Sequence, residues 1–223
     1  MRLLGVSKTS QQGKAPASHA GLAGFESQVL HRKEVGMLHA FYSDPHFGHD
    51  NIRLPEYADR PFSSVEEMDE ALVTNYNEVV GPTDTVLWCG DAFFRFSTTP
   101  QRIMPRLNGY KVLVLGNHDR SPRTMLRVGF DLVLREAFVQ VANRVCRVSH
   151  YPYAGSPGRG KAVDDRHAKR RPPRVKGEVL IHGHTHSKRR IFENQIHVGV
   201  DSWDFRPATF GEVGELVRQH FPV

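Results

Sequence analysis

Residues 112–120, VLVLGNHDR, contain an apolar run that breaks at Gly116 and continues with an amide, an imidazole and a carboxylate. An apolar run of this length before a glycine is typical of a buried strand that ends in a turn. Polar side chains directly after such a strand lie at one edge of a sheet, where α/β proteins gather their chemistry. The stretch therefore predicts a strand whose carboxyl end carries functional groups.

The same pattern recurs along the chain. Further apolar runs, at residues 38–43, 85–89, 145–148 and 179–182, end in DPH, GD, SH and GHTH, respectively. Helical patterns are expected between or after them, at residues 64–80, 100–107, 121–128 and 210–220, with capping boxes at Ser64/Glu67 and Thr209/Glu212. Short apolar strands that alternate with helices predict a single α/β domain, and the sequence shows no internal repeat.

Charge and composition divide the 223 residues into a tail and a domain, and they single out one loop within the domain. Residues 1–36 lack a sustained period and are expected to form a flexible N-terminal tail, which leaves a domain over residues 37–223. The net charge is +6, and residues 154–177 alone carry eight Lys and Arg against two Asp. This segment is rich in Gly and Pro, so we expect a basic flap loop that attracts an anionic substrate. A solvated loop without a catalytic role is the alternative.

Neither a membrane span nor an exported protein is indicated by the sequence. The chain has no run of about 18 apolar residues and no secretory signal pattern. We therefore expect a cytoplasmic protein with no membrane partner. Cys89 and Cys146 lie inside apolar runs, which predicts free buried thiols rather than a disulfide. The sequence does not determine the oligomeric state.

Five of the strand-end side chains are ligands that divalent cations prefer. Asp44 and His46 lie two residues apart in extended chain, so both project on the same side. His184 and His186 repeat this spacing in GHTH. Asp91 follows a glycine, and its two oxygens can serve two cations at once. These positions predict a metal site at the C-terminal ends of the strands.

Asn117 and His150 each stand alone at another strand end and bring the candidate ligands to seven. Seven donors exceed the needs of one ion and fit two divalent cations that share Asp91. A mixture of carboxylate, amide and imidazole without thiolate favours Mn, with Fe or Zn as alternatives. Two ions about 3.5 to 4 Å apart form a clamp that recurs at sites of displacement at phosphorus.

Five strings follow one another in a fixed order: DPH (44–46), GD (90–91), GNHD (116–119), SHYP (149–152) and GHTH (183–186). In this order they resemble the signature of the calcineurin-like, or binuclear, metallophosphoesterase superfamily, and the likeness covers about residues 37–210. FYSDPHFGHDNI and VGVDSWDFRP look like a compact bacterial and phage branch of that superfamily. The resemblance implies an α/β fold of the four-layer αββα sandwich type, with the metal site at the strand C-terminal ends.

The resemblance also implies how the candidate ligands divide between two ions. One ion would be held by Asp44, His46, Asp91 and His186. The other would be held by Asp91, Asn117, His150 and His184. His118 would face the leaving-group oxygen as general acid, a role that suits imidazole because its ordinary pKa is about 6.5.

The expected activity is metal-dependent hydrolysis of a phosphoester, with a phosphodiester favoured over a monoester. The catalytic residues would be His118 and Asp91, and a hydroxide that bridges the ions would attack phosphorus. The substrate would be a phosphoester such as a nucleotide or a nucleic acid strand. One alternative is a single-stranded nucleic acid endonuclease, although the sequence shows no aromatic-rich surface for stacking bases. The other is a nucleic-acid-binding protein with a structural metal site.

Four further residues are candidates for substrate binding: His49, Asn51, Arg60 and Arg95. The first two follow the first ligands and could equally cap a loop through local hydrogen bonds. The two arginines could grip phosphate oxygens in a fork, or could be ordinary surface residues.

Two other positions near the motifs allow two interpretations each. Asp119 could orient its loop or pair with Arg120. Asp201 could accept a hydrogen bond from a ligating imidazole, or belong to a simple turn. His182 is expected to be structural, and the remaining scattered histidines, including His167, carry no pattern.

Overall fold

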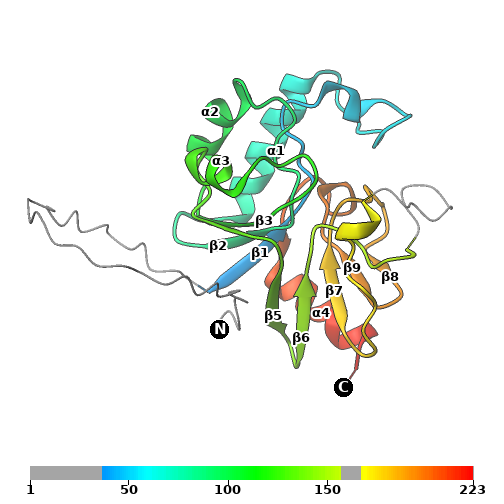
Figure 1. Ribbon diagram of the computed structural model, residues 1–223. Helices are drawn as coiled ribbons and strands as arrows, with labels where there is room; N and C mark the ends of the chain where they lie inside the picture. Colours follow the sequence, from blue (N-terminus) through cyan, green and yellow to red (C-terminus); the bar gives the residue numbers. More distant parts are fainter. Residues whose placement is uncertain (1–36, 157–166, 223) are drawn as a thin grey trace, which may run out of the picture.

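A computed structural model of the chain describes residues 37–156 and 167–222 (Figure 1). The expected tail at residues 1–36 lies outside the described residues. Of the expected flap, residues 154–156 and 167–177 are described, and residues 157–166 are not. Among the helices that the structure describes, none combines the length and the apolarity needed to cross a bilayer.

The first sheet has five strands in the order β10-β1-β2-β3-β4. Its strands are β1 (Leu38–Tyr42), β2 (Thr85–Trp88), β3 (Tyr110–Val114), β4 (Leu132–Leu134) and β10 (Ala208–Thr209). Strands β1 to β4 are parallel, and β10 is antiparallel to β1. The carboxyl ends of the first four strands therefore meet at one edge of the sheet.

The second sheet also has five strands, in the order β5-β6-β7-β9-β8. Its strands are β5 (Ala137–Val141), β6 (Arg144–Val148), β7 (Val179–His182), β8 (Ile191–Phe192) and β9 (Gln195–His197). Strands β6, β7 and β9 are parallel, whereas β5 and β8 pair antiparallel at the two edges. Like the first sheet, it is mixed.

Four α-helices connect or follow these strands: α1 (Val65–Val79), α2 (Thr99–Ile103), α3 (Pro122–Arg127) and α4 (Phe210–His220). Short 3-10 helices are η1 (Asp50–Arg53), η2 (Met104–Arg106), η3 (Ala168–Arg170) and η4 (Val200–Ser202). Figure 1 shows α1, α2 and α3 gathered on one side of the first sheet, while the second sheet lies on the other. Helix α4 contacts β1, β10 and β5.

The two predicted capping boxes have different outcomes. At α4, the Thr209 hydroxyl accepts from the Glu212 backbone N–H and the Glu212 carboxylate accepts from the Thr209 backbone, as predicted. At α1, the Ser64 hydroxyl accepts from the Glu67 backbone N–H at 3.0 Å. The Glu67 carboxylate, however, accepts from the backbone of Ser63 instead of Ser64. At α1, the hydrogen bond to the Glu67 carboxylate therefore comes from the residue before the predicted cap residue.

Alternation along β1 explains the two apolar cores. Ala40 and Tyr42 belong to a buried cluster with α1, whereas Phe41 between them belongs to a second cluster that joins the two sheets. Ile181 of β7 and Val213 of α4 also enter the second cluster. The predicted α/β class is thus confirmed, with two mixed sheets packed face to face. Both cysteines are free and buried, as predicted.

The sheets meet at the edge where the polar motifs begin. An isolated parallel bridge joins Ser43, directly after β1, to Gly199 near the end of β9. The Gly183 backbone N–H, directly after β7, donates to the His150 carbonyl at 3.1 Å. The ends of β1, β2, β3, β6 and β7 are consequently brought around one space.

Candidate metal centre

Left-handed backbone turns direct the candidate ligands into this space. Five of them have positive φ: Asp44 (56°), His46 (50°), Asp91 (55°), His184 (70°) and His186 (49°). A non-glycine residue in this region costs of order 1 kcal/mol or more and persists only where the surroundings hold it. Here the Asp44 and His46 backbone N–H groups donate to the carbonyls of Gly90 and Asp91 at 3.1 and 3.2 Å. The hydrogen bonds between strand ends therefore maintain the turns.

Two glycines allow carboxylates to lie directly against the backbone. A Cβ on Gly116 would collide with Oδ1 of Asp91, and a Cβ on Gly183 would collide with Oδ2 of Asp44. The glycines of GNHD and GHTH are thus required by close approach to the candidate ligands.

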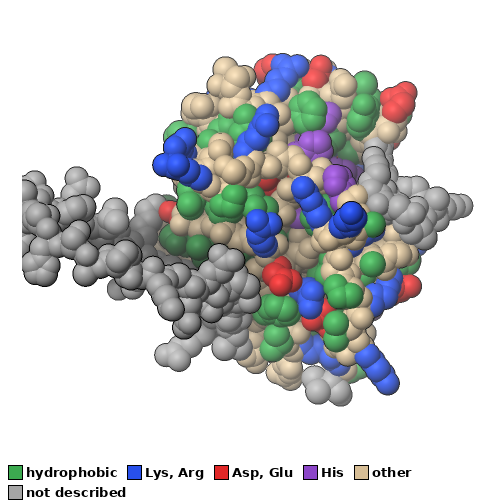
Figure 2. Space-filling view, viewed as in Figure 1, with side chains coloured by type: hydrophobic (Ala, Val, Ile, Leu, Met, Phe, Trp, Pro, Cys, Tyr) green, Lys and Arg blue, Asp and Glu red, His purple; other side chains and the backbone are tan. Residues whose placement is uncertain are grey.

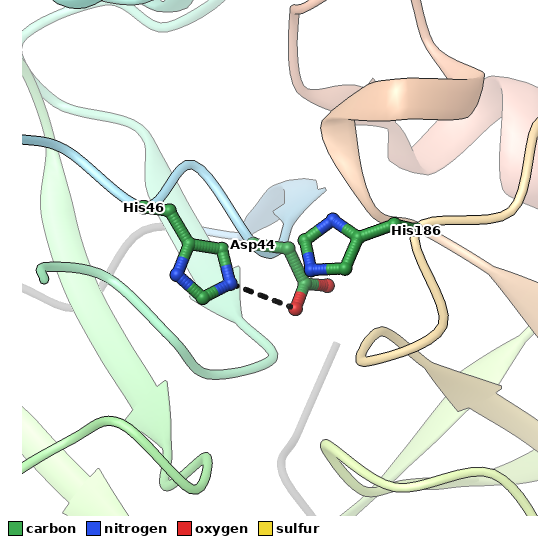
Figure 3. Close-up of side chains that lie close together, drawn as sticks. All are labelled: Asp44, His46 and His186. Carbon is green, nitrogen blue, oxygen red and sulfur yellow. Dashed lines mark ion pairs between the residues drawn. The ribbon is translucent and has the colours of Figure 1, made fainter. Parts of the chain in front are cut away.

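The first group of donors consists of Asp44, His46 and His186, whose potential ligand atoms lie within 4.8 Å of one another. Figure 3 shows the three side chains converging from two segments of the chain. Nε2 of His46 lies 3.9 Å from Oδ1 of Asp44. This group contains three of the four ligands expected for one ion.

The second group consists of Asp91, His150 and His184, again within 4.8 Å of one another. Nε2 of His150 lies 3.1 Å from Nδ1 of His184 and 3.0 Å from Oδ1 of Asn117. The other ring nitrogen of His150 is 2.7 Å from the Cys89 carbonyl, a contact that leaves Nε2 directed into the group. All four ligands expected for the second ion are therefore adjacent.

Asp91 joins the two groups. Its Oδ2 lies 3.5 Å from Nε2 of His46 and 3.4 Å from Nε2 of His150. Its Oδ1 accepts from the His118 backbone N–H at 2.8 Å. A carboxylate in this position can serve donors on both sides, as its placement after β2 suggested.

Unpartnered atoms test whether the residues fit a cation. Oδ1 of Asp44 and both ring nitrogens of His46 are buried and make no hydrogen bond within the described residues. A buried polar atom without a partner costs about 1 to 3 kcal/mol, and a bound cation would supply the missing partner. The carboxylate and imidazole donors suit Mn, Fe or Zn. The geometry thus fits metal binding at these groups.

Burial and charge set the protonation of the rings. Burial lowers the pKa of His46 well below its usual range, and burial together with the neighbouring His150 lowers the pKa of His184 to about 2. Burial also disfavours a charged His150, but the Asp91 and Asp44 carboxylates outweigh it and raise the pKa of that ring to about 9. His46 and His184 are therefore neutral near pH 7, with lone pairs free for a metal.

A buried ion pair positions His186. Nδ1 of His186 lies 2.8 Å from Oδ2 of Asp201, which favours the interpretation of Asp201 as the partner of a ligating imidazole. Asp201 also accepts from Arg60, through Nε at 2.8 Å and Nη2 at 3.0 Å. The same guanidinium donates to the carbonyls of Asp44 and Pro45 at 2.7 and 2.8 Å.

This arrangement corrects the expectation that Arg60 binds substrate. Its side chain has no exposed surface, and its guanidinium is occupied by Asp201 and two carbonyls. Arg60 is therefore a positioning residue for the first donor group. Arg95 is exposed and is not among the residues that line the cavity described next.

The polar residues of the loop after β3 have different roles. The Asp119 carboxylate accepts from the backbone N–H groups of Asp91, Ala92 and Gly116 at 2.8 to 3.0 Å, so it orients the loop. Arg120 does not pair with it and lies over the Phe96 ring at 5.2 Å instead. His118 is exposed, with potential ligand atoms within 4.8 Å of His46 and Asp91.

A cavity of about 540 Å³ opens onto both donor groups. It is lined by His46, His49, Asn51, Ile52, Tyr57, Ala58, Asp91, Phe94, Asn117, His118, His167, His184, Thr185 and His186. In Figure 2 the histidines form a hollowed patch, with Lys and Arg side chains around it. The predicted residues His49 and Asn51 are thus at the cavity, although Nδ1 of His49 also accepts from the Ile52 backbone N–H at 3.1 Å.

Six of the lining residues were not predicted, and three of these carry rings. Tyr57 and Phe94 are 43% and 45% exposed at its mouth, and the His167 ring lies 5.6 Å from the His184 ring. The consecutive aromatics directly after GD in GDAFF were the available signal for Phe94. Tyr57 and His167 lie in loops without a period, so no signal pointed to them. His182 is buried against the Gly183 carbonyl at 2.8 Å, as its structural interpretation requires.

No family model matches the chain. It is 34% identical over 203 residues to the gene 66 protein of Mycobacterium phage L5, a match that covers 80% of this chain and 93% of the relative. The gene 66 protein of Mycobacterium phage D29 is 32% identical over 201 residues, covering 80% and 94%. The uncharacterized protein MJ1445 of Methanocaldococcus jannaschii is 41% identical over 80 residues, which are 35% of this chain and 44% of that protein.

A solved structure shares the fold. The crystal structure of the protein of unknown function AQ665 from Aquifex aeolicus matches with a TM-score of 0.61 at 26% sequence identity. The match covers 79% of this chain and 97% of the Aquifex protein. The α/β arrangement described above is therefore found in a second, distant sequence.

Proposed function

The chain belongs to the family of the gene 66 protein of Mycobacterium phage L5, and we propose that it is a metal-dependent phosphoesterase of the calcineurin-like type. The observation that carries the proposal is the pair of His and Asp groups joined by Asp91. Unpartnered atoms of Asp44 and His46 face this site. The five motif strings of the superfamily contain these residues, each at a strand end.

The fold supports the proposal at the level of layers. Two mixed sheets pack face to face, and α1, α2 and α3 form a helical layer on the outer side of the first sheet. A helical layer over two packed sheets is compatible with the four-layer αββα sandwich that the proposal implies. Helix α4 packs against β1 and β10 of the first sheet and against β5 of the second.

The proposal assigns two divalent cations, with Mn favoured. One would be held by Asp44, His46, Asp91 and His186, and the other by Asp91, Asn117, His150 and His184. Bound cations would activate water and neutralise negative charge on the phosphoryl group.

His118 is the proton donor in this proposal. It is exposed at the cavity, and its backbone N–H is tied to Asp91 at 2.8 Å, so the loop holds the ring beside both donor groups. Hydrolysis forms one P–O bond from water and breaks the ester P–O bond, and the leaving oxygen takes its proton from His118. Asp119 keeps this loop in place through three backbone amides.

The test compares phosphodiesters with good and poor leaving groups in the presence of Mn. We expect hydrolysis of bis-p-nitrophenyl phosphate that a chelator abolishes. His118→Ala should keep the bound metal but lose about 10²- to 10⁴-fold in rate on an alkyl diester, and lose less on the nitrophenyl ester, whose leaving group needs no proton. Asp91→Asn should lose both metal and activity.

Two results would contradict the proposal. If the metal-loaded protein hydrolyses no phosphoester, the site is structural, as in a nucleic-acid-binding protein with a structural metal site. If His118→Ala has wild-type rates on both leaving groups, His118 is not the acid.

A further inference from the structure

An aromatic surface lies at the mouth of the cavity. The rings of Phe94 and His49 have centroids 3.8 Å apart, and the Tyr57 ring lies 6.0 Å from His49. Phe94 is 45% exposed and Tyr57 is 43% exposed, so neither side chain is buried in the apolar core. The sequence showed no aromatic-rich surface, whereas in the structure residues from two separate loops place these two half-exposed rings in the lining of one cavity.

This surface is in direct ring contact with the candidate metal centre. The Phe94 ring centroid lies 5.6 Å from that of His118, and the His118 centroid lies 5.2 Å from that of His46. Exposed aromatics scattered singly are ordinary, but here two occupy the wall of one polar cavity. A planar aromatic group of a substrate would cover them while its phosphoester reaches the donors.

A basic groove lies on the other side of the centre. It has a volume of about 580 Å³, and its lining includes Arg120, Arg135, Lys169 and Arg170. Arg147, also in the lining, pairs with Glu178 at 3.0 Å and with Glu136 at 3.6 Å, whereas no ion pair within the described ranges involves Arg135 or Lys169. The groove also contains two carboxylates: Asp119, which three backbone amides already satisfy, and Glu136, which lies 3.6 Å from Nη1 of Arg147 in the same lining. Its positive charge is therefore available to an anion.

The groove and the cavity share a wall. Gly116 and Asp119 line the groove, while Asn117 and His118 between them line the cavity. The Tyr151 ring lies 5.1 Å from the His184 ring, and its hydroxyl accepts from Nη1 of Arg170 at 3.2 Å. An extended ligand can thus touch the aromatic surface, the metal donors and the basic groove in succession.

We propose that the substrate is single-stranded nucleic acid, with an unpaired base on Phe94 and Tyr57 and neighbouring phosphates in the groove of Arg135, Lys169 and Arg170. That the bound strand is hydrolysed at the metal donors rests on the proposed phosphoesterase function, whereas the way the strand binds does not. A mononucleotide offers a base without neighbouring phosphates, a duplex keeps its bases stacked inside, and an acidic peptide has no planar group at regular spacing. Single strands combine both features.

Binding is measured with the full-length protein and a labelled oligothymidylate, in chelator, by fluorescence anisotropy. Phe94→Ala should weaken binding about 5- to 150-fold, and Phe94→Trp should restore it. The same Phe94→Ala change should leave the affinity for an abasic strand of equal length unaltered, because that strand has phosphates but no bases. Phe192→Ala is the matched control, since Phe192 is exposed on β8 and lines neither surface.

The contribution of the groove is tested by the salt dependence of binding. Arg135→Ala combined with Arg170→Ala should weaken binding of both strands and lower the slope of log affinity against log salt by about 0.7 per lost phosphate contact. Arg218→Ala on α4, outside the groove, should leave the slope unchanged.

The proposal is overturned if the wild-type protein binds duplex and abasic strands as tightly as oligothymidylate, or if the groove variants keep the wild-type salt slope. Hydrolysis of bis-p-nitrophenyl phosphate is measured on separate samples of the same preparations, loaded with Mn and free of chelator. Hydrolysis without base-dependent binding contradicts this inference alone. Base-dependent binding without hydrolysis supports the binding mode and contradicts the phosphoesterase function.

Discussion

Phe41 and Asp44 lie three residues apart at the end of β1 and have opposite environments. Phe41 is fully buried between the sheets and stacks on Phe210, with ring centroids 6.2 Å apart. Asp44 is equally buried, but it has a left-handed backbone and an unpartnered oxygen. The apolar core therefore provides the stability that lets the strand ends hold strained, polar and charged groups. The predictions below test this division from the largest expected effect to the smallest.

Removing a ring from the core should have the largest effect on stability. Phe41→Ala should lower the free energy of unfolding by about 3 to 5 kcal/mol, because it deletes a fully buried ring and leaves a cavity. Denaturant unfolding measures the change. The exposed Phe192→Ala should stay within about 0.5 kcal/mol. Equal losses in the two variants would show that the inter-sheet cluster is not the main source of stability.

Breaking the buried pair of Arg60 and Asp201 should cost nearly as much. Arg60→Ala leaves the Asp201 carboxylate buried without its cation, so we expect a loss of about 3 kcal/mol or more in the free energy of unfolding. It should also weaken metal binding, since His186 is oriented by Asp201. Thermal unfolding in a calorimeter measures the loss of stability, and calorimetric titration with Mn measures the loss of metal affinity. A variant of normal stability that only raises KM would restore Arg60 as a substrate-binding residue.

Metal should stabilise the strand ends and not the core. Mn at about 100 times its dissociation constant should add about 2.7 kcal/mol to the free energy of unfolding, because it binds the folded state alone. Asp44→Asn should reduce this gain, as it weakens one ligand. Phe192→Ala should keep it in full. A gain unchanged in Asp44→Asn would place the bound ion elsewhere.

The smallest effect concerns a carboxylate outside both regions. The side-chain hydrogen bond from Arg206 is the main cause that lowers the pKa of Glu212 from 4.5 to about 2. Because the folded-state pKa is depressed, this carboxylate stabilises the protein above about pH 4.5, and the contribution is lost as pH falls toward 2.

Glu212→Gln should therefore cost about 1 kcal/mol at pH 7, from the weakened cap of α4, and progressively less below pH 4.5. Urea unfolding of both proteins across this range measures the difference. A difference that grows toward acid pH would reverse the sign and disprove the assignment.

The strands found from the sequence are those with apolar runs. Strands β1, β2, β3, β6 and β7 were expected within one or two residues: β2 and β7 are buried at every position, which demands such runs, and β6 buries Cys146 and Val148 between more exposed neighbours. Strands β4, β5, β8 and β10 were not expected, and β9 was expected only as a strand without bounds before Asp201. They are short or lie at sheet edges, and their pairing depends on partners elsewhere in the chain.

The candidate site, like the strands, could be predicted only where the signal is local in the sequence. The candidate ligands follow apolar runs and could be named, because parallel strands bring their carboxyl ends together. Arg60 could not be assigned correctly, since its partner Asp201 is 141 residues away. An isolated arginine in a sequence has no feature that distinguishes a buried ion pair from a phosphate contact.

The sequence by itself determined the α/β class and the positions of the polar clusters at strand ends, because apolar runs and glycine breaks are local patterns. Only the tertiary structure decided that Oδ2 of Asp91 lies within 3.5 Å of a ring nitrogen on each side, that Arg60 is buried on Asp201, and that Tyr57 and Phe94 line one cavity. These are relations between distant segments. They arise when two sheets pack through a common core, and no local pattern encodes the distances that result.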